Sequence, residues 1–152
     1  VPARMIEPSN HTPRNALRGN QLVCIALLLG QFVFAIVIVV AQQTGAWESS
    51  SSDPEVTHML AIIGTAVGVA SIPTAYTIRK VLWQRGAGEE TTKLLQAFFI
   101  GNIAFQAVLE GASLLNLTFW LISGTMLPHV PVFAVLFTIG VTALLRTRAP
   151  AD

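Results

Sequence analysis

The chain alternates between long apolar stretches and short polar connections. Four apolar stretches lie near residues 22–41, 59–78, 97–120 and 130–145. Each approaches the roughly 20 residues that a helix needs, at about 1.5 Å per residue, to cross about 30 Å of hydrocarbon. The pattern predicts an all-α integral membrane protein with four membrane-spanning helices.

The connections between the stretches carry helix-breaking residues. Gly86 and Gly88 interrupt the connection between the second and third stretches, and Gly124 follows the third stretch as a helix stop. Short connections place consecutive helices antiparallel. We therefore expect an up-down-up-down four-helix bundle that forms a single domain over residues 1–152.

The basic residues predict the orientation of this bundle. All 9 Lys and Arg residues lie before the first stretch, between the second and third, or after the fourth, which is one side of the membrane in this arrangement. Because Lys and Arg favour the cytoplasmic side, both ends of the chain are expected to be cytoplasmic. Trp47, Trp83 and Trp120 fall near expected helix ends, where an indole ring suits the membrane interface.

The composition supports a membrane location. Hydrophobic residues make up 53% of the chain and charged residues only 11%, against about 25% charged residues in soluble proteins. A formal net charge of +1 without a basic face argues against a nucleic-acid partner. The expected partners are the lipid bilayer and other membrane subunits or further copies of the chain, in a bacterial inner (plasma) membrane.

The sequence contains few candidates for catalysis or metal binding. His58 and His129 lie at the expected outer boundary, where we expect surface residues, and the one cysteine, Cys24, cannot form a multi-cysteine site. We find no phosphate-binding loop, no metalloprotease motif and no nucleophile with a neighbouring histidine in a span. We therefore expect no enzyme activity, no cofactor and no metal.

The second stretch carries small residues at helical spacing. Gly64 and Gly68 form a GxxxG motif, and Ser71 and Ala75 continue the same face. Small residues let membrane helices approach closely, so we expect these four residues to form a helix contact. Pro73 is expected to bend the same helix because it removes a backbone donor.

The third stretch carries polar residues on one face. At about 100° per residue they fall within an arc of about 120°: Asn102, Gln106, Glu110, Ser113 and Asn116. We call these five residues the polar stripe. Glu110 lies near the expected middle of the membrane, and no Lys or Arg occurs inside an expected span. A charged carboxylate at that depth is costly, so we expect Glu110 to be neutral, paired or in contact with water.

Three roles are open for Glu110. It could be a protonated acid that hydrogen-bonds to Gln106, Asn102 or Gln31 of the first stretch and determines which helix faces which. It could carry a proton or cation by alternating between its protonated and deprotonated forms. It could also contact another subunit or a bound quinone-like or lipid molecule.

Two resemblances bear on these roles. The segment "IGNIAFQAVLEGASLLNLTFWL" resembles the carboxylate-bearing helix of the rotary ATPase c-type proteolipids, which implies a proton-carrying Glu110. The segment "AVLEGASLLNLTFWLISG" resembles the third helix of uncharacterised four-span bacterial inner-membrane proteins with an LEGA-type stretch, a family that implies the layout and no activity. We expect a non-catalytic structural or accessory subunit of a membrane assembly. The alternative is a small proton-coupled transporter or proteolipid with Glu110 as its ionisable centre.

Overall fold

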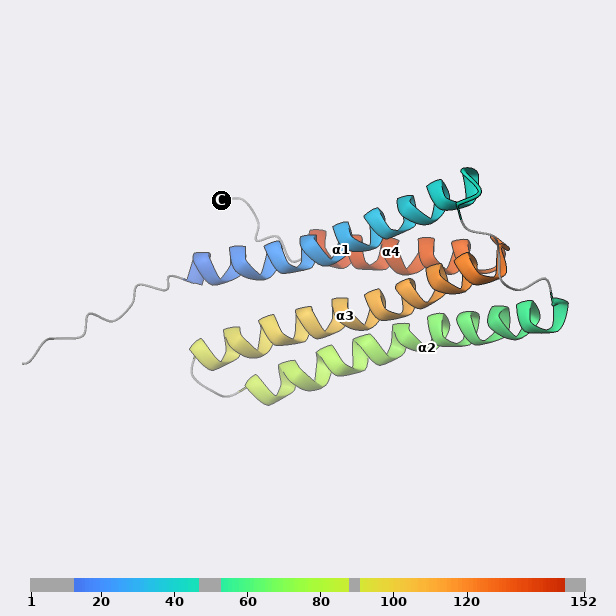
Figure 1. Cartoon of the computed structure of the whole chain (residues 1–152). Coiled ribbons are helices and arrows are strands. Elements are labelled where there is room, and N and C mark those ends of the chain that lie inside the picture. Colours follow the sequence, from blue (N-terminus) through green and yellow to red (C-terminus); the bar gives the residue numbers. More distant parts are fainter. Residues whose placement is uncertain (1–12, 47–52, 88–90, 147–152) are drawn as a thin grey trace, which may run out of the picture.

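Four α-helices make up nearly all of the described chain, which comprises residues 13–46, 53–87 and 91–146 of a computed structural model. They are α1 (Pro13–Gln43), α2 (Pro54–Gly86), α3 (Thr91–Ser123) and α4 (His129–Arg146). Consecutive helices run in opposite directions, so α1 begins at the end of the bundle where α2 passes into α3, and the shorter α4 runs toward that end (Figure 1). The expected all-α, up-down-up-down architecture is confirmed.

Each helix is long and apolar enough to cross a membrane. The two middle helices exceed that need, because α2 and α3 have 33 residues each and are therefore about 50 Å long. α4 is the shortest, with 18 residues. The apolar stretches of the sequence thus lie inside longer helices, whose additional turns carry polar residues.

Local sequence explains where the helices begin and end. The Asp53 carboxylate accepts a hydrogen bond of 2.9 Å from the Glu55 N–H, and Pro54 occupies the first position of α2. At the end of α3, Gly124 has a φ of +68° and donates its N–H to the Trp120 carbonyl oxygen at 2.9 Å. Glycine suits this left-handed conformation, so the predicted helix stop is confirmed.

Pro73 lies inside α2 and does not end it. α2 continues as a helix through Pro73 up to Gly86. Gly88, Trp47 and both chain termini lie outside the described residues.

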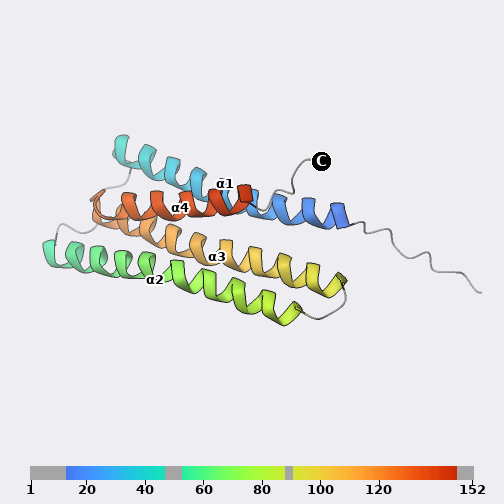
Figure 2. The same ribbon diagram turned by 180° about the vertical axis from the view of Figure 1, so that it is seen from behind.

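α3 is the central helix of the bundle. It packs against all three others, whereas α1 and α2 make no contact with each other in the described part of the chain. In both side views α3 runs between α1 and α2, and α4 lies beside α3 (Figures 1 and 2). The first connection therefore joins helices on opposite flanks of α3, so α1 and α2 are neighbours in sequence but not in space.

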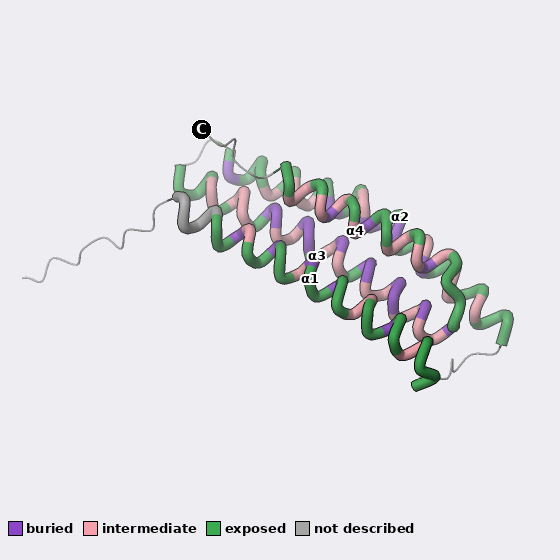
Figure 3. Tube along the Cα trace, turned by 90° about the horizontal axis from the view of Figure 1, so that it is seen from above, coloured by how far each residue is buried: buried purple, intermediate pink, exposed green. Residues whose placement is uncertain are grey.

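Burial follows this arrangement. Buried positions concentrate along α3, while the outward faces of α1 and α2 are mostly exposed (Figure 3). The buried apolar side chains form two clusters. One contains Ala75, Phe105, Leu109, Ala112 and Leu136, and the other contains Ile38, Leu117 and Trp120. The outward faces expose large apolar side chains such as Leu29, Phe32 and Ile62, as lipid-facing helices do.

Trp120 contradicts one expectation from the sequence. It is only 4% exposed and packs with Ile38 and Leu117, and its indole N–H has no hydrogen-bond partner. The expectation that the ring keeps its apolar body in lipid is therefore wrong, because the ring packs inside the bundle. The reason is that Trp120 follows Asn116 by one helical turn and shares the inward face of α3. Trp83, in contrast, is partly exposed and stacks on the Phe98 ring, with centroids 5.1 Å apart.

Candidate functional site

The polar stripe of α3 points into the bundle. Asn102, Gln106, Ser113 and Asn116 are all buried, with exposed fractions between 0% and 6%. Glu110 is only partly buried. Because α3 is central, one face of this helix can reach all three neighbours. The stripe is therefore where the four helices meet.

Three residues of the stripe lie against a glycine, each on a different helix. The pairs are Asn116 with Gly64 of α2, Gln106 with Gly140 of α4, and Glu110 with Gly30 of α1. A Cβ added to Gly64 would lie 2.7 Å from Asn116 Oδ1, and one added to Gly140 would lie 2.9 Å from Gln106 Nε2. The third contact is looser, because a Cβ added to Gly30 would lie 3.9 Å from Glu110 Oε1. The polar side chains thus occupy space that the missing glycine side chains leave.

At the end of the stripe nearest to the start of α4, Asn116 connects three helices. Its amide Nδ2 donates to the Gly64 and Ala112 carbonyl oxygens, each at 3.0 Å. Its Oδ1 lies 3.3 Å from His129 Nδ1. An amide oxygen can only accept, so the proton of this bond belongs to His129 Nδ1. The Phe119 ring stands edge-on to the imidazole, with centroids 5.9 Å apart.

The expectation that both outer histidines are surface residues is wrong for His129. His58 is exposed, but His129 is 0% exposed and its Nε2 has no hydrogen-bond partner. His129 begins α4 and shares one helix face with Leu136 and Gly140, because spacings of 7 and 11 residues bring side chains to nearly the same angle. That periodicity is the signal by which the sequence could have predicted its burial.

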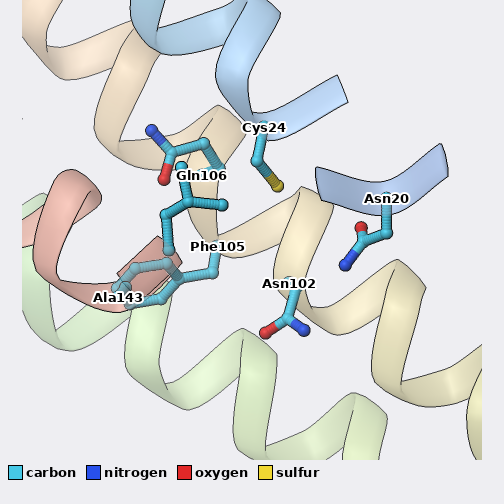
Figure 4. A pocket seen from close by; sticks show the side chains of 7 residues that line it. Asn20, Cys24, Asn102, Phe105, Gln106 and Ala143 are labelled. Atoms are coloured by element: carbon cyan, nitrogen blue, oxygen red, sulfur yellow. The ribbon is translucent and has the colours of Figure 1, made fainter. Parts of the chain in front are cut away.

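At the opposite end of the stripe, α1, α3 and α4 line a small, partly open cavity of about 10 Å³. Its lining includes Asn20 and Cys24 of α1 and Asn102 and Gln106 of α3, whose side chains gather between the two helices in Figure 4. Asn20 Oδ1, Asn102 Nδ2 and Gln106 Nε2 are buried without a direct partner. One acceptor and two donors around this volume suit a single bridging water.

Sequence reasoning missed Asn20, which lies before the expected first span. The signal was a period of 11 residues in α1, because Asn20, Gln31 and Gln42 fall on one helix face. Gln42 Nε2 donates to the Trp120 carbonyl oxygen at 3.4 Å. Gln31 is 1% exposed, and its Oε1 has no partner. An amide side chain therefore recurs on the inward face of α1 from Asn20 to Gln42.

The Glu110 side chain makes no hydrogen bond and no ion pair within the described residues. The bond to Gln106, Asn102 or Gln31 that the first of its three roles requires is thus not present in the structure. Glu110 lies at the edge of the stripe's arc and faces α1 at Gly30, where no side chain is available to meet it. The carboxyl group is left partly exposed and unpaired.

The small-residue face of α2 lies in the helix contact. Gly64, Gly68, Ser71 and Ala75 are all buried. A Cβ on Gly68 would collide with the Val132 side chain of α4. Ser71 Oγ donates to the Gly68 carbonyl oxygen at 2.7 Å, which satisfies its hydroxyl within the helix. These residues let α2 approach both α3 and α4.

Among the residues that the structure describes, no three His, Cys, Asp or Glu side chains come together as metal ligands would. No protein-family model matches the chain, and neither a curated protein nor a solved structure is significantly similar to it. The interpretation of the polar stripe therefore rests on its own geometry and chemistry.

Proposed function

We propose that this protein is a multi-pass protein of a bacterial inner membrane and acts there as a non-catalytic subunit of a larger membrane assembly. Support for the membrane location comes from four helices that are long and apolar enough to span a bilayer. The exposed apolar side chains of α1 and α2 support it further, because such surfaces are stable in lipid and unstable in water.

The contrast between Asn116 and Glu110 carries the proposal of a subunit. Asn116 is 0% exposed and its amide bonds to α2 and α4, as expected of a group that serves the fold of one chain. Glu110 is partly exposed and is unpaired within the part of the chain that the structure describes. A polar side chain at the middle of a bilayer is expensive unless another group satisfies it. A helix from a second subunit would supply that group.

The surface beside Glu110 allows such an approach. Gly30 of α1 and Gly111 of α3 are both exposed, and a Cβ added to Gly111 would meet nothing within 4 Å. Small residues permit close contact between membrane helices, and a polar group in the contact adds a hydrogen bond. The partner helix is therefore expected to carry a hydrogen-bonding side chain at the depth of Glu110.

Cross-linking in native membranes tests this proposal. In a Cys24→Ser background, Gly111→Cys is expected to form a cross-linked species, while Ala66→Cys, on an exposed position of α2, is not. Glu110→Gln should preserve the cross-link because glutamine retains the size and hydrogen-bonding capacity, and Glu110→Leu should abolish it. If the Gly111→Cys chain migrates as a monomer, with Glu110 or with glutamine at that position, the result contradicts the subunit role.

The second candidate is a proton-coupled transporter or proteolipid with Glu110 as its ionisable centre. This candidate is supported by buried polar atoms that have no hydrogen-bond partner among the described residues. They recur along the bundle, at Asn102, Gln106, Ser113 and His129. These atoms extend along the bundle, because Asn102 and Ser113 are separated by about 16 Å along α3. Proton flux into vesicles distinguishes the candidates: if Glu110→Gln abolishes a pH-driven flux while the cross-link persists, the transporter replaces the subunit.

A further inference from the structure

The groove between α2 and α4 has a cationic end. Two adjoining cavities there, of about 210 and 460 Å³, share Tyr76, Arg79 and Arg146 in their linings. Lys80 lines the larger cavity and Thr142 the smaller. Among the residues that the structure describes, no acidic side chain lines either cavity. The groove thus concentrates positive charge at the end of the bundle where α4 terminates.

Arg79 is held in place without neutralisation of its charge. Its guanidinium lies 4.4 Å from the centre of the Trp83 ring and 5.4 Å from that of Phe105. Such cation–π contacts orient the group but leave its N–H donors available. The buried Nε has no hydrogen-bond partner, and no ion pair is made by Arg79 or Arg146 in the described part of the chain. An anion would satisfy both guanidinium groups.

Further along, the same groove becomes apolar. A cavity of about 200 Å³ between α2 and α4 is lined by Val69 and Ile72 on one side and Val132 and Val135 on the other. The distance from Val69 to Arg79 along α2 is about 15 Å. This is about half the thickness of the hydrocarbon core, and hence about one leaflet. A charged end and an apolar extension of this length match one phospholipid.

We propose that this groove binds one anionic phospholipid, with its phosphate between Arg79 and Arg146 and an acyl chain against Ile72 and Val135. The site rests on the proposed membrane location, in which Arg79 and Arg146 lie at the cytoplasmic boundary of the hydrocarbon. Anionic lipids are enriched in that leaflet, and basic pockets between membrane helices bind their headgroups. The planar guanidinium group of Arg79 can donate two parallel hydrogen bonds to the phosphate oxygens.

Native mass spectrometry of the full chain in detergent tests the site. We expect one phosphatidylglycerol to be retained at least about ten-fold more tightly than phosphatidylcholine. The double variant Arg79→Gln/Arg146→Gln should lose this preference. Arg18→Gln, at an exposed position on α1, is the matched control and should keep it. Equal retention of both lipids by the native chain, or an unchanged preference in the double variant, overturns the proposal.

Three further measurements separate the alternatives. Inorganic phosphate that displaces the lipid at equal concentration would identify a site for a soluble anion and overturn the lipid assignment. If the double variant fails to fold, the site can be tested on the native chain by the quenching of Trp83 fluorescence with brominated lipids. The Trp83→Phe variant is the reference that identifies the Trp83 signal. Brominated phosphatidylglycerol must quench this signal more than brominated phosphatidylcholine does. Carbonate extraction tests the membrane location separately. If the chain stays in the membrane but shows no lipid preference, only the lipid site is refuted, and the membrane location stands.

Discussion

Asn116 of α3 donates a hydrogen bond of 3.0 Å to the carbonyl oxygen of Gly64 on α2. This contact joins two features that look independent in the sequence, the polar stripe of the third helix and the GxxxG motif of the second. The absence of a side chain at position 64 makes it possible, since a Cβ there would lie 2.7 Å from Asn116 Oδ1 and 3.0 Å from His129 Nδ1. The motif thus makes room for a polar network as well as for a neighbouring helix.

Gly64→Ala should destabilise the protein. Asn116, His129 and Phe119 all lie within 3.1 Å of the added Cβ and would have to shift. Overpacking of this kind costs about 1–3 kcal/mol. The measurement is the free energy of unfolding in mixed detergent micelles.

Gly111→Ala is the matched control for this substitution, because a Cβ at Gly111 meets nothing within 4 Å. It should be neutral or slightly stabilising, since alanine favours the helix. If both variants lose the same stability, the contact at Gly64 does not control the packing of α2 on α3.

The bond between Asn116 and His129 should be measurable as a coupling energy. A double-mutant cycle with Asn116→Ala and His129→Phe is expected to give about 0.6 kcal/mol and not more than about 1.7 kcal/mol, the range found for hydrogen bonds between membrane helices. The single change Asn116→Ala should cost more, about 1–3 kcal/mol, because it leaves the buried imidazole without a partner. Additive single-variant effects would mean that the two side chains act independently.

Cys24 should react slowly with a small permeant maleimide in detergent micelles. It is 5% exposed and lies in the cavity lining beside Gln106. Ala26→Cys in a Cys24→Ser background places a thiol at nearly the same depth on the exposed face of α1. We expect Cys24 to react about ten-fold more slowly, because local opening must precede its modification.

Gln106→Ala should accelerate the labelling of Cys24, since it enlarges the cavity beside the thiol. An unchanged rate in this variant would contradict the arrangement of α1 on α3 at this level. The same reaction therefore reports on both the burial of Cys24 and its neighbour across the helix contact.

The membrane topology can be tested at two exposed positions next to helix ends. Ala46 follows α1, and Ala87 follows α2 at the opposite end of the bundle. In a Cys24→Ser background, an impermeant thiol reagent added to intact cells should label Ala46→Cys and not Ala87→Cys, because the basic connection is expected on the cytoplasmic side. If the reagent labels both positions from the same side, α2 does not cross the membrane.

Much of the fold could be predicted because its signals are local. The apolar stretches, the glycine stop at Gly124 and the short connections each act within a few residues, and the structure confirms four antiparallel helices. The shared face of the polar stripe could also be predicted, because the periodicity of a helix determines angles along a single element. What that face would meet could not be predicted in the same way.

Errors arose where a residue's surroundings depend on another helix. His129 and Trp120 are near helix ends, and position along the chain suggested exposure, yet both are buried against neighbouring helices. For Glu110 the expected amide partners exist, but α1 presents Gly30 to its carboxyl group. Which residue of α1 lies opposite Glu110 depends on the rotation and axial shift of two separate helices.

The sequence by itself determined four apolar helices, their alternating directions and a polar face on the third, because hydrophobicity and helical periodicity are properties of one segment at a time. Only the tertiary structure decided that α3 lies at the centre, that its polar side chains fit against glycines of three different helices, and that Glu110 has no partner among the described residues. The physical reason is that the apolar surfaces of helices can pack against one another in many arrangements. The close fit of small and polar side chains between them selects one.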